Sequence, residues 1–175
     1  MTHHENEKVV KEGVTLTKLQ QANNIIKNRV LVTAGTGLIP LPLVDLVALF
    51  GVQIDMLRVL AKLYNVPFRK DIGKSMVASL LGGVLPVSIT PAMASLFKMI
   101  PIIGTTTGAV TMSIMGGAFT YAVGKVFIQH FESGGTFLDF NPEKVKEYFR
   151  QQYEEGKKVA EEAQNSKESQ TAEAV

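Results

Sequence analysis

Apolar positions recur at helical spacing near the start of the chain. Between residues 16 and 33 they follow one another at intervals of three, four and seven, which places them on one face of a helix. The segment Thr17-Lys18-Leu19-Gln20 fits a capping box, in which the first and last side chains satisfy free backbone N–H groups at a helix start. The pattern predicts a helix from about Thr15 or Thr17 to Gly35 or Gly37. Its expected apolar face comprises Leu16, Leu19, Ile26, Val30 and Thr33.

The next stretch, GTGLIPLPLVDLVALFG, is apolar but contains two prolines and one carboxylate. Glycine and proline lower helix propensity, and proline also removes a backbone donor, so we expect the chain to turn here. A second helix should run from Pro42 or Leu43 to Tyr64. The two helices predict a first helical hairpin, about residues 15–64, with an uncharged tip. The turn residues are Gly35, Gly37, Pro40 and Pro42.

Asp45 is the carboxylate of this stretch and the first candidate functional residue. If Pro42 is an early helical residue, Asp45 falls in the first turn, where a carboxylate caps exposed N–H groups and complements the helix dipole. The alternative interpretation is an acid at membrane depth that faces a partner, a proton or a cation. The sequence leaves both interpretations open.

Two long uncharged runs follow, at residues 75–97 and 99–124. Roughly 20 apolar residues span the hydrocarbon core of a bilayer, so each run is long enough to do so. We therefore predict a membrane-type hairpin over 75–124, within a second helical hairpin of about 70–132. Lys98 and a turn that contains Pro101 and Gly104 separate its arms, and Lys98 is the second candidate functional residue.

Small residues are frequent in both runs, and in lipid they let helices approach closely. The alternative is a soluble helical bundle that buries this hairpin. A chain of this length can bury one helix on all sides, but hardly two adjacent helices of more than 20 residues. The candidate helix-packing positions are Gly104, Gly108, Gly116 and Gly117.

The polar C-terminal third predicts one amphipathic helix. Asn141-Pro142-Glu143 combines an N-cap, a proline at the first helical position and an acid in the first turn. The helix should continue to about Ala163, with Phe149 and Tyr153 on an apolar stripe that we expect to form a partner surface. No segment alternates with period two, so the predicted fold class is all-α.

Composition fits one domain and excludes several kinds of chemistry. The 175 residues contain no cysteine, which excludes disulfides and thiol chemistry. The net charge of +2 does not indicate nucleic-acid binding. We expect a disordered leader over residues 1–13, a single helical domain over 14–163 and a disordered tail over 164–175.

The distribution of cations predicts how the chain meets a membrane. Lys98 is the one cation of 18 that falls at the tip of the second hairpin. If both hairpins enter and leave on the same side, the other 17 face the cytoplasm together with both termini, as the positive-inside rule favours. A straight span through residues 30–54 would place five cations on the far side, so we expect the first hairpin to be re-entrant or to lie on the surface.

Motifs for catalysis, metals and cofactors are weak. Gly73-Lys74-Ser75 resembles the end of a phosphate-binding loop, but position 68, where that motif needs glycine, holds Phe68. His130 has no nearby histidine partner, and a metal site needs three or four converging ligands. We therefore predict no catalytic residue, no metal and no cofactor, and hence no enzyme.

The order of several motifs resembles that of a bacterial family, domain of unknown function 697, whose helical domains are often found with small GTPase domains. The resemblance covers about residues 15–150 and implies an all-helical domain with a GTPase partner acting in trans. The matching residues are Ala34-Gly35, Gly37-Leu38-Ile39-Pro40, Pro42, Asp45, Gln53, Met56-Leu57, Leu80-Leu81-Gly82-Gly83, Ile100-Pro101, Gly104-Thr105, Thr120-Tyr121-Ala122, Gly124, Phe131 and Gly134 or Gly135.

The function we expect is that of a non-enzymatic protein associated with the bacterial inner membrane. It would self-associate as a homo-oligomer and dock a cytosolic partner of the GTPase class. One alternative is an oligomeric channel or transport assembly in which Asp45 or Lys98 faces a conduit. The other is a soluble helical interaction module whose apolar hairpin is covered by a partner or by a second copy.

Overall fold

The computed structural model describes residues 16–36, 42–84 and 105–173, and the regular secondary structure of these residues is entirely helical. The all-α prediction is confirmed. The helices are α1 (Lys18–Thr36), α2 (Pro42–Tyr64), α3 (Lys70–Val84), α5 (Thr105–Glu132) and α6 (Pro142–Glu173).

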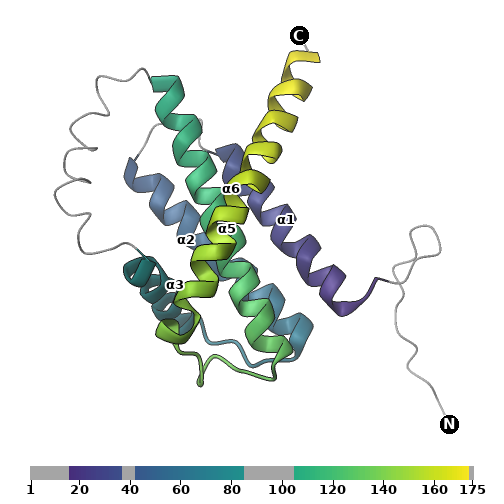
Figure 1. The fold of residues 1–175 in the computed structure, drawn as a ribbon, viewed down its shortest axis with the longest axis vertical. Helices are drawn as coiled ribbons and strands as arrows, with labels where there is room; N and C mark the ends of the chain where they lie inside the picture. The colour runs from purple at the N-terminus through teal and green to yellow at the C-terminus, as the bar shows by residue number, and fades with distance from the viewer. Residues whose placement is uncertain (1–15, 37–41, 85–104, 174–175) are drawn as a thin grey trace.

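Helix α5 is the central helix of the bundle, as Figure 1 shows. It packs against α1, α2 and α6, whereas α3 packs against α2 and α6. Every residue from 117 to 124 is buried, which spans about two turns. A helix that is apolar on all sides is stable only when others cover it. Part of the apolar run predicted for lipid therefore forms the protein core.

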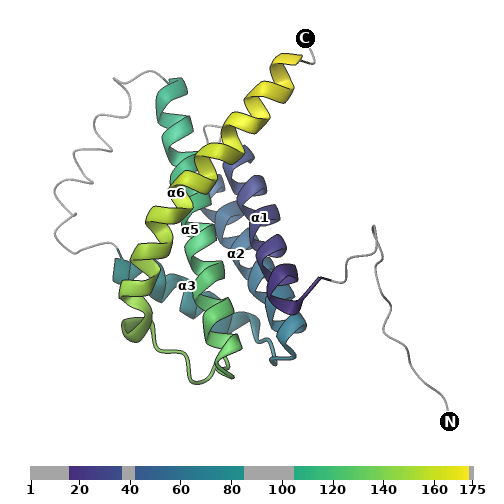
Figure 2. The same cartoon turned by 45° about the vertical axis from the view of Figure 1, so that its right-hand side comes forward.

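Side-chain contacts fix the directions of the three inner helices. Gln53 of α2 bonds to Thr120 of α5, and Gly116 of α5 faces Leu49 of α2, so these two helices run parallel. Arg29 of α1 pairs with Asp55 of α2, and α1 runs antiparallel to both (Figures 1 and 2).

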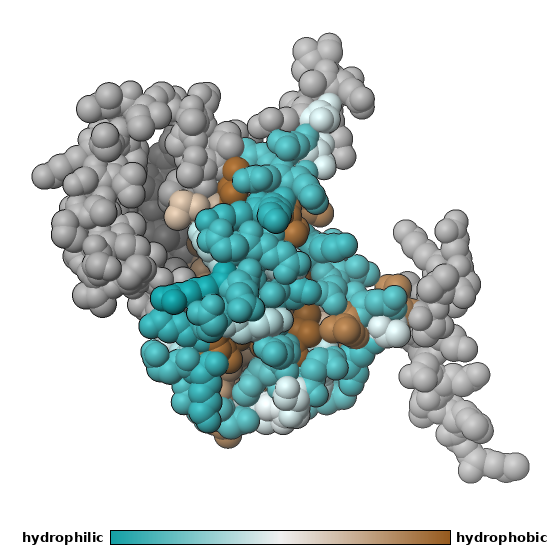
Figure 3. All heavy atoms as spheres, in the orientation of Figure 1, coloured by the Kyte–Doolittle hydropathy of each residue, from teal (hydrophilic) through white to brown (hydrophobic). Residues whose placement is uncertain are grey.

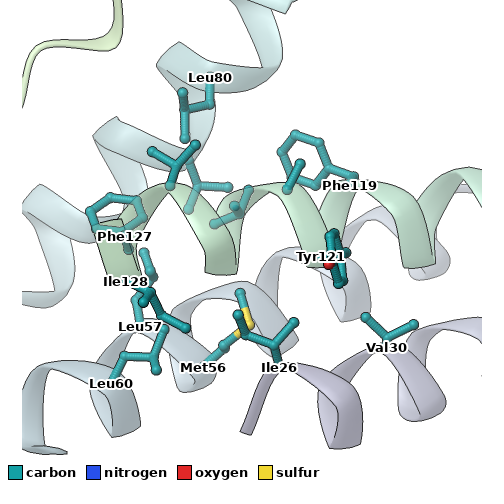
Figure 4. Close-up of a cluster of buried hydrophobic side chains, with 14 of the residues drawn as sticks. Ile26, Val30, Met56, Leu57, Leu60, Leu80, Phe119, Tyr121, Phe127 and Ile128 are labelled. Carbon is teal, nitrogen blue, oxygen red and sulfur yellow. The ribbon is translucent and has the colours of Figure 1, made fainter. Parts of the chain in front are cut away.

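The core combines side chains from the inner helices, α3 and α6. The close-up in Figure 4 shows the part of it that comes from the inner helices and α3. Phe127 of α5 is fully buried and stacks on Phe140 with ring centroids 4.6 Å apart. Fully burying one such side chain contributes about 1.5–3 kcal/mol. The labelled members of the cluster are Ile26, Val30, Met56, Leu57, Leu60, Leu80, Phe119, Tyr121, Phe127 and Ile128.

The start of α1 confirms the predicted capping box. The N–H of Thr17 donates to Oε1 of Gln20 at 2.7 Å, and the N–H of Gln20 donates to Oγ1 of Thr17 at 3.2 Å. The predicted apolar face is wrong at its beginning, because Leu16 and Leu19 are exposed. The buried face comprises Ala22, Ile26, Val30, Thr33 and Ala34.

Helix α2 has the predicted bounds, and α2 and α5 end in the same way. In each, a residue with positive φ follows the helix: Asn65 after α2 and Gly134 after α5. The N–H of Val66 donates to Ala61, and that of Gly135 donates to His130, as in a Schellman motif. These caps direct the chain into α3 and into the loop that leads to α6.

Helix α6 begins as predicted but is longer. Oδ1 of Asn141 accepts the N–H groups of Glu143 and Lys144, which confirms the N-cap. The helix passes the expected end at Ala163 and continues to Glu173, so most of the predicted disordered tail is helical. Its last turns diverge from the bundle in Figure 2, and hydrophilic residues dominate the face on which it lies in Figure 3.

The predicted second hairpin differs from the observed packing of its arms. Helix α3 is amphipathic: Val77 and Leu80 are buried, whereas Lys74 and Ser75 are exposed. Its main neighbours are α2 and α6, not the other predicted arm, α5. Within residues 16–36, 42–84 and 105–173, no helix has both the length and the apolar character needed to cross a membrane.

Candidate functional site

The predicted turn residues fall partly within helices. Gly35 is the penultimate residue of α1, which ends at Thr36, within the range predicted for the end of this helix. Pro42 is the first residue of α2, where its missing N–H costs no helical hydrogen bond. The other predicted turn residues, Gly37, Pro40, Pro101 and Gly104, lie outside the described residues.

The two candidate functional residues have different outcomes. Asp45 is the fourth residue of α2, close to the predicted place at the helix start. Its role as a cap or as a membrane-depth acid stays a prediction. Lys98 lies outside the described residues.

A close contact between α5 and α6 is built from small residues. A Cβ added at Gly117 would lie 2.7 Å from Cβ of Ala160, and one at Gly156 would lie 2.8 Å from the carbonyl oxygen of Ala118. Real Cβ atoms do not approach so closely, so both positions require glycine. Gly117 was predicted as a packing position. Gly156 was not, because the apolar stripe predicted for its helix rested on Phe149 and Tyr153. The predicted positions Gly116 and Gly108 also lie in α5.

Glycines of α5 also allow α1 to pack closely against it. Gly124 lies seven residues after Gly117, and a Cβ there would lie 2.6 Å from Cγ1 of Ile26. Gly117 itself faces Val30 and Ala34 of α1. The seven-residue spacing keeps both glycines on one face of α5. Sequence reasoning missed the packing role of Gly124, although this spacing could have revealed it.

Gln53 and Thr120 form a buried polar pair between α2 and α5. Nε2 of Gln53 donates to Oγ1 of Thr120 at 2.7 Å, and that hydroxyl donates to the carbonyl of Gly116 at 2.9 Å. Both side chains are fully buried, and Oε1 of Gln53 has no partner among the described residues. A buried polar group needs a hydrogen bond, so the pair fixes the register of α2 along α5.

The predicted partner surface on α6 is corrected at Phe149. This side chain is fully buried, and its ring centroid lies 5.7 Å from that of Phe119. Tyr153 is half-buried, stacked at 6.4 Å on Phe149, with Lys157 over its ring. The apolar stripe of α6 therefore packs on α5, and the exposed side of α6 is charged.

Beyond the Gln53–Thr120 pair, toward the ends of α2 and α5, an ion pair and polar contacts connect the inner helices α1, α2 and α5. Nη2 of Arg29 lies 2.5 Å from Oδ2 of Asp55, and Nζ of Lys125 donates to Asn23 at 3.0 Å. Tyr64 donates to Glu132. Burial, then this hydrogen bond and the charge of Glu132, raise the pKa of the Tyr64 phenol.

The loop between α5 and α6 has its own polar network. Nε2 of His130 lies 2.7 Å from the carbonyl oxygen of Thr136, and Oδ1 of Asp139 accepts both the hydroxyl and the N–H of Thr136. These hydrogen bonds, with a smaller contribution from His130, hold the pKa of Asp139 below its ordinary value. The network closes the loop over Phe137, which is buried.

This arrangement can position helices and present surfaces. Its polar side chains make contacts within the bundle, and within the part of the chain that the structure describes no group of three or more His, Cys, Asp or Glu residues could hold a metal ion. The described residues therefore form a packed helical scaffold with a charged outer helix.

Comparison with known sequences decides the family. The sequence profile described as "Domain of unknown function (DUF697)" matches residues 2–158, which is most of the chain. The chain belongs to the DUF697 family. This agrees with the resemblance found from the motifs between residues 15 and 150.

A curated relative of this DUF697 protein is "Magnetosome membrane protein 22" of Magnetospirillum gryphiswaldense. The two are 38% identical over 149 residues, which cover 85% of this chain and 76% of the relative. No solved structure is significantly similar to the chain.

Proposed function

We propose that this DUF697 protein is a non-enzymatic, membrane-associated helical protein that self-associates and docks a cytosolic GTPase. The observation that carries the membrane association is the segment 75–124, in which Lys98 is the one charged residue. Charged groups in hydrocarbon are costly, so a segment of this length without them suits lipid contact. The name of the relative, a magnetosome membrane protein, supports the same location for this chain.

The distribution of cations supports a bacterial inner membrane with both termini in the cytoplasm. Cations outside Lys98 lie before residue 30, between Arg58 and Lys74, and from Lys125 onward. In this arrangement they all remain on the cytoplasmic side, where the positive-inside rule places them.

The docking surface for a GTPase is the outer face of α6. Exposed charges recur along it at spacings of three and four, at Glu147, Arg150, Glu154 and Lys158. Charged faces favour transient association, because complementary charge steers encounter without burying a large apolar area. The class of partner rests on family membership, since domains of this family often accompany small GTPases.

Fractionation of cells that express the full chain tests the membrane association. The protein should sediment with membranes, stay there through high salt and alkaline carbonate, and be released by detergent. Light scattering of the detergent-solubilised protein should then give the mass of a homo-oligomer. Recovery without detergent as a monodisperse monomer in the supernatant would contradict both parts of the proposal.

A separate binding experiment tests the partner class. Purified small GTPases from the same genome should bind the solubilised protein more tightly in one nucleotide state, GTP or GDP, than in the other. The double variant Arg150→Glu, Lys158→Glu should lose this binding, whereas Lys18→Glu, far from α6 in sequence and also exposed, should retain it. Equal binding by both variants would remove α6 as the surface.

A further inference from the structure

Charge divides the three inner helices into two ends. The level of division is the Gln53–Thr120 pair, and two residues further along α2 the Arg29–Asp55 ion pair joins α2 to α1. We call residues 30–36 of α1, 42–53 of α2 and 105–120 of α5 the apolar end. Asp45 is its one charged residue. The remaining parts of the same helices contain Lys18, Lys27, Arg29, Asp55, Arg58, Lys62, Lys125 and Glu132.

These segments lie together in space although they are distant in the sequence. Helices α2 and α5 run parallel and α1 runs antiparallel to them, so the start of α2, the start of α5 and the end of α1 meet at one end of the bundle (Figures 1 and 2). The contact of Gly117 with Ala34 confirms that α1 reaches this level of α5.

The apolar end exposes large hydrophobic side chains. Leu31 and Val32 of α1 and Met115 of α5 are 39%, 43% and 44% exposed. Exposed leucines also occur at the opposite end, where Leu138 is 81% exposed, but Asp139 and Glu132 accompany it there. Apolar exposure alone therefore does not distinguish the two ends. The apolar end differs because its exposed side chains have no charged neighbours in the sequence.

From this asymmetry we infer that the bundle enters the membrane by its apolar end, with the Arg29–Asp55 pair facing the aqueous side. The inference rests on the proposed membrane association and adds its orientation. The occupant is lipid, because residues 99–104, which precede α5 in the sequence, are also uncharged and mostly apolar, as lipid contact requires.

The charges of α6 limit how deeply the apolar end enters the membrane. Ala160 contacts Gly117 at the apolar end, and the residues on either side of it, Lys157, Lys158, Glu161 and Glu162, carry charge at this level. In both views the helix then diverges from the start of α5 (Figures 1 and 2). Charged groups at this height are costly in hydrocarbon, so the described bundle enters only the outer part of one leaflet.

Single cysteines test the orientation, because the natural chain contains none. Val32→Cys and Met115→Cys label the apolar end, and Leu138→Cys is the matched control at the opposite end. Each variant is bound to vesicles of phosphatidylethanolamine and phosphatidylglycerol and treated with a charged, membrane-impermeant maleimide. Vesicles should slow labelling at positions 32 and 115 by about tenfold or more, because the reactive thiolate is disfavoured in hydrocarbon, and leave position 138 unchanged.

Flotation of the wild-type chain with the same vesicles separates the two proposals. If the chain floats but position 138 is protected while 32 and 115 react freely, the orientation is overturned and the membrane association stands. Equal protection of all three positions also overturns the orientation. If the chain does not float, the proposed function fails and the inference fails with it.

Labelling without vesicles tests whether a second copy of the chain, instead of lipid, covers the apolar end. Positions 32 and 115 should then react as fast as an exposed thiol. Slow labelling in the absence of lipid, at a rate that depends on protein concentration, would mean that a second copy covers this end and would overturn the inference. Leu31→Cys provides a further probe of the same end if either variant fails to fold.

Discussion

Gly117 of α5 and Ala160 of α6 are in such close contact that a Cβ on the glycine would lie 2.7 Å from that of the alanine. The preceding residue in α5 is Gly116. A Cβ added there would lie 3.7 Å from Cδ1 of Leu49, which is an ordinary van der Waals distance. Of these two adjacent glycines, Gly117 therefore has no room for a side chain, whereas Gly116 has room for a methyl group.

Gly117→Ala should destabilise the protein by about 1–3 kcal/mol, because the added methyl group separates α5 from α6. Gly116→Ala should be neutral or stabilise by about 0.5–1 kcal/mol, because alanine is the better helix residue and has room there. Urea unfolding followed by circular dichroism measures both. Equal effects of the two substitutions would mean that the α5–α6 contact is looser than described.

The contact of Gly124 with Ile26 predicts a non-additive pair of substitutions. Gly124→Ala alone should destabilise, since the new Cβ would lie 2.6 Å from the isoleucine Cγ1. Ile26→Ala alone should cost about 2–5 kcal/mol through the cavity that it leaves. In the double variant the added methyl group occupies part of that cavity, so the loss of unfolding free energy should be smaller than the sum. Simple additivity, measured by the same unfolding experiment, would contradict a direct contact.

The Gln53–Thr120 pair predicts an asymmetry between its two members. Thr120→Val removes the acceptor and leaves the buried Nε2 of Gln53 without a partner, which should cost about 1–3 kcal/mol. Gln53→Leu removes both that donor and the unpaired Oε1, while the hydroxyl of Thr120 keeps Gly116 as its acceptor, so its cost should be smaller. Thermal unfolding of both variants measures the difference, and a greater loss for Gln53→Leu would count against this hydrogen-bond pattern.

The N-cap of α6 predicts a further difference between similar substitutions. Asn141→Ala should reduce the free energy of unfolding by about 0.5–2 kcal/mol, because the N–H groups of Glu143 and Lys144 lose their acceptor. Asn141→Asp keeps an acceptor oxygen and should preserve most of the stability. Comparable losses in the two variants, measured by denaturant unfolding, would show that the cap contributes little.

The loop network predicts a stability difference that depends on pH. The pKa of Asp139 is lowered in the folded state, so its ionised form stabilises the fold above the unfolded pKa, and this contribution is lost as pH falls through the folded pKa. The wild-type chain should therefore be more stable than Asp139→Asn at neutral pH. The difference should begin to shrink as pH falls below the value near 3.9 at which Asp titrates in unfolded chains, and it should disappear once the pH is below the folded pKa. A difference that persists in acid would exclude the carboxylate as its cause.

Local signals in the sequence determined much of the secondary structure. The capping box at Thr17, the proline at position 42 and the Asn141 cap each act within one helical turn, and all three begin helices where expected. The end of α6 was missed because its polar last turns have no apolar stripe. The family could also be predicted from the sequence, because the order of its motifs can be recognised without knowing the fold.

Tertiary structure decided which apolar surfaces meet. The hydropathy of the run 99–124 fits a membrane arm and a helix buried in a bundle equally well. Three neighbouring helices cover residues 117–124 and make this part of the run a core segment. Burial of Phe149 required α6 to lie on α5, a contact made by Gly117, Gly156 and Ala160. Hydrophobicity along a chain reports which groups avoid water; only packing in three dimensions selects the neighbours that cover them.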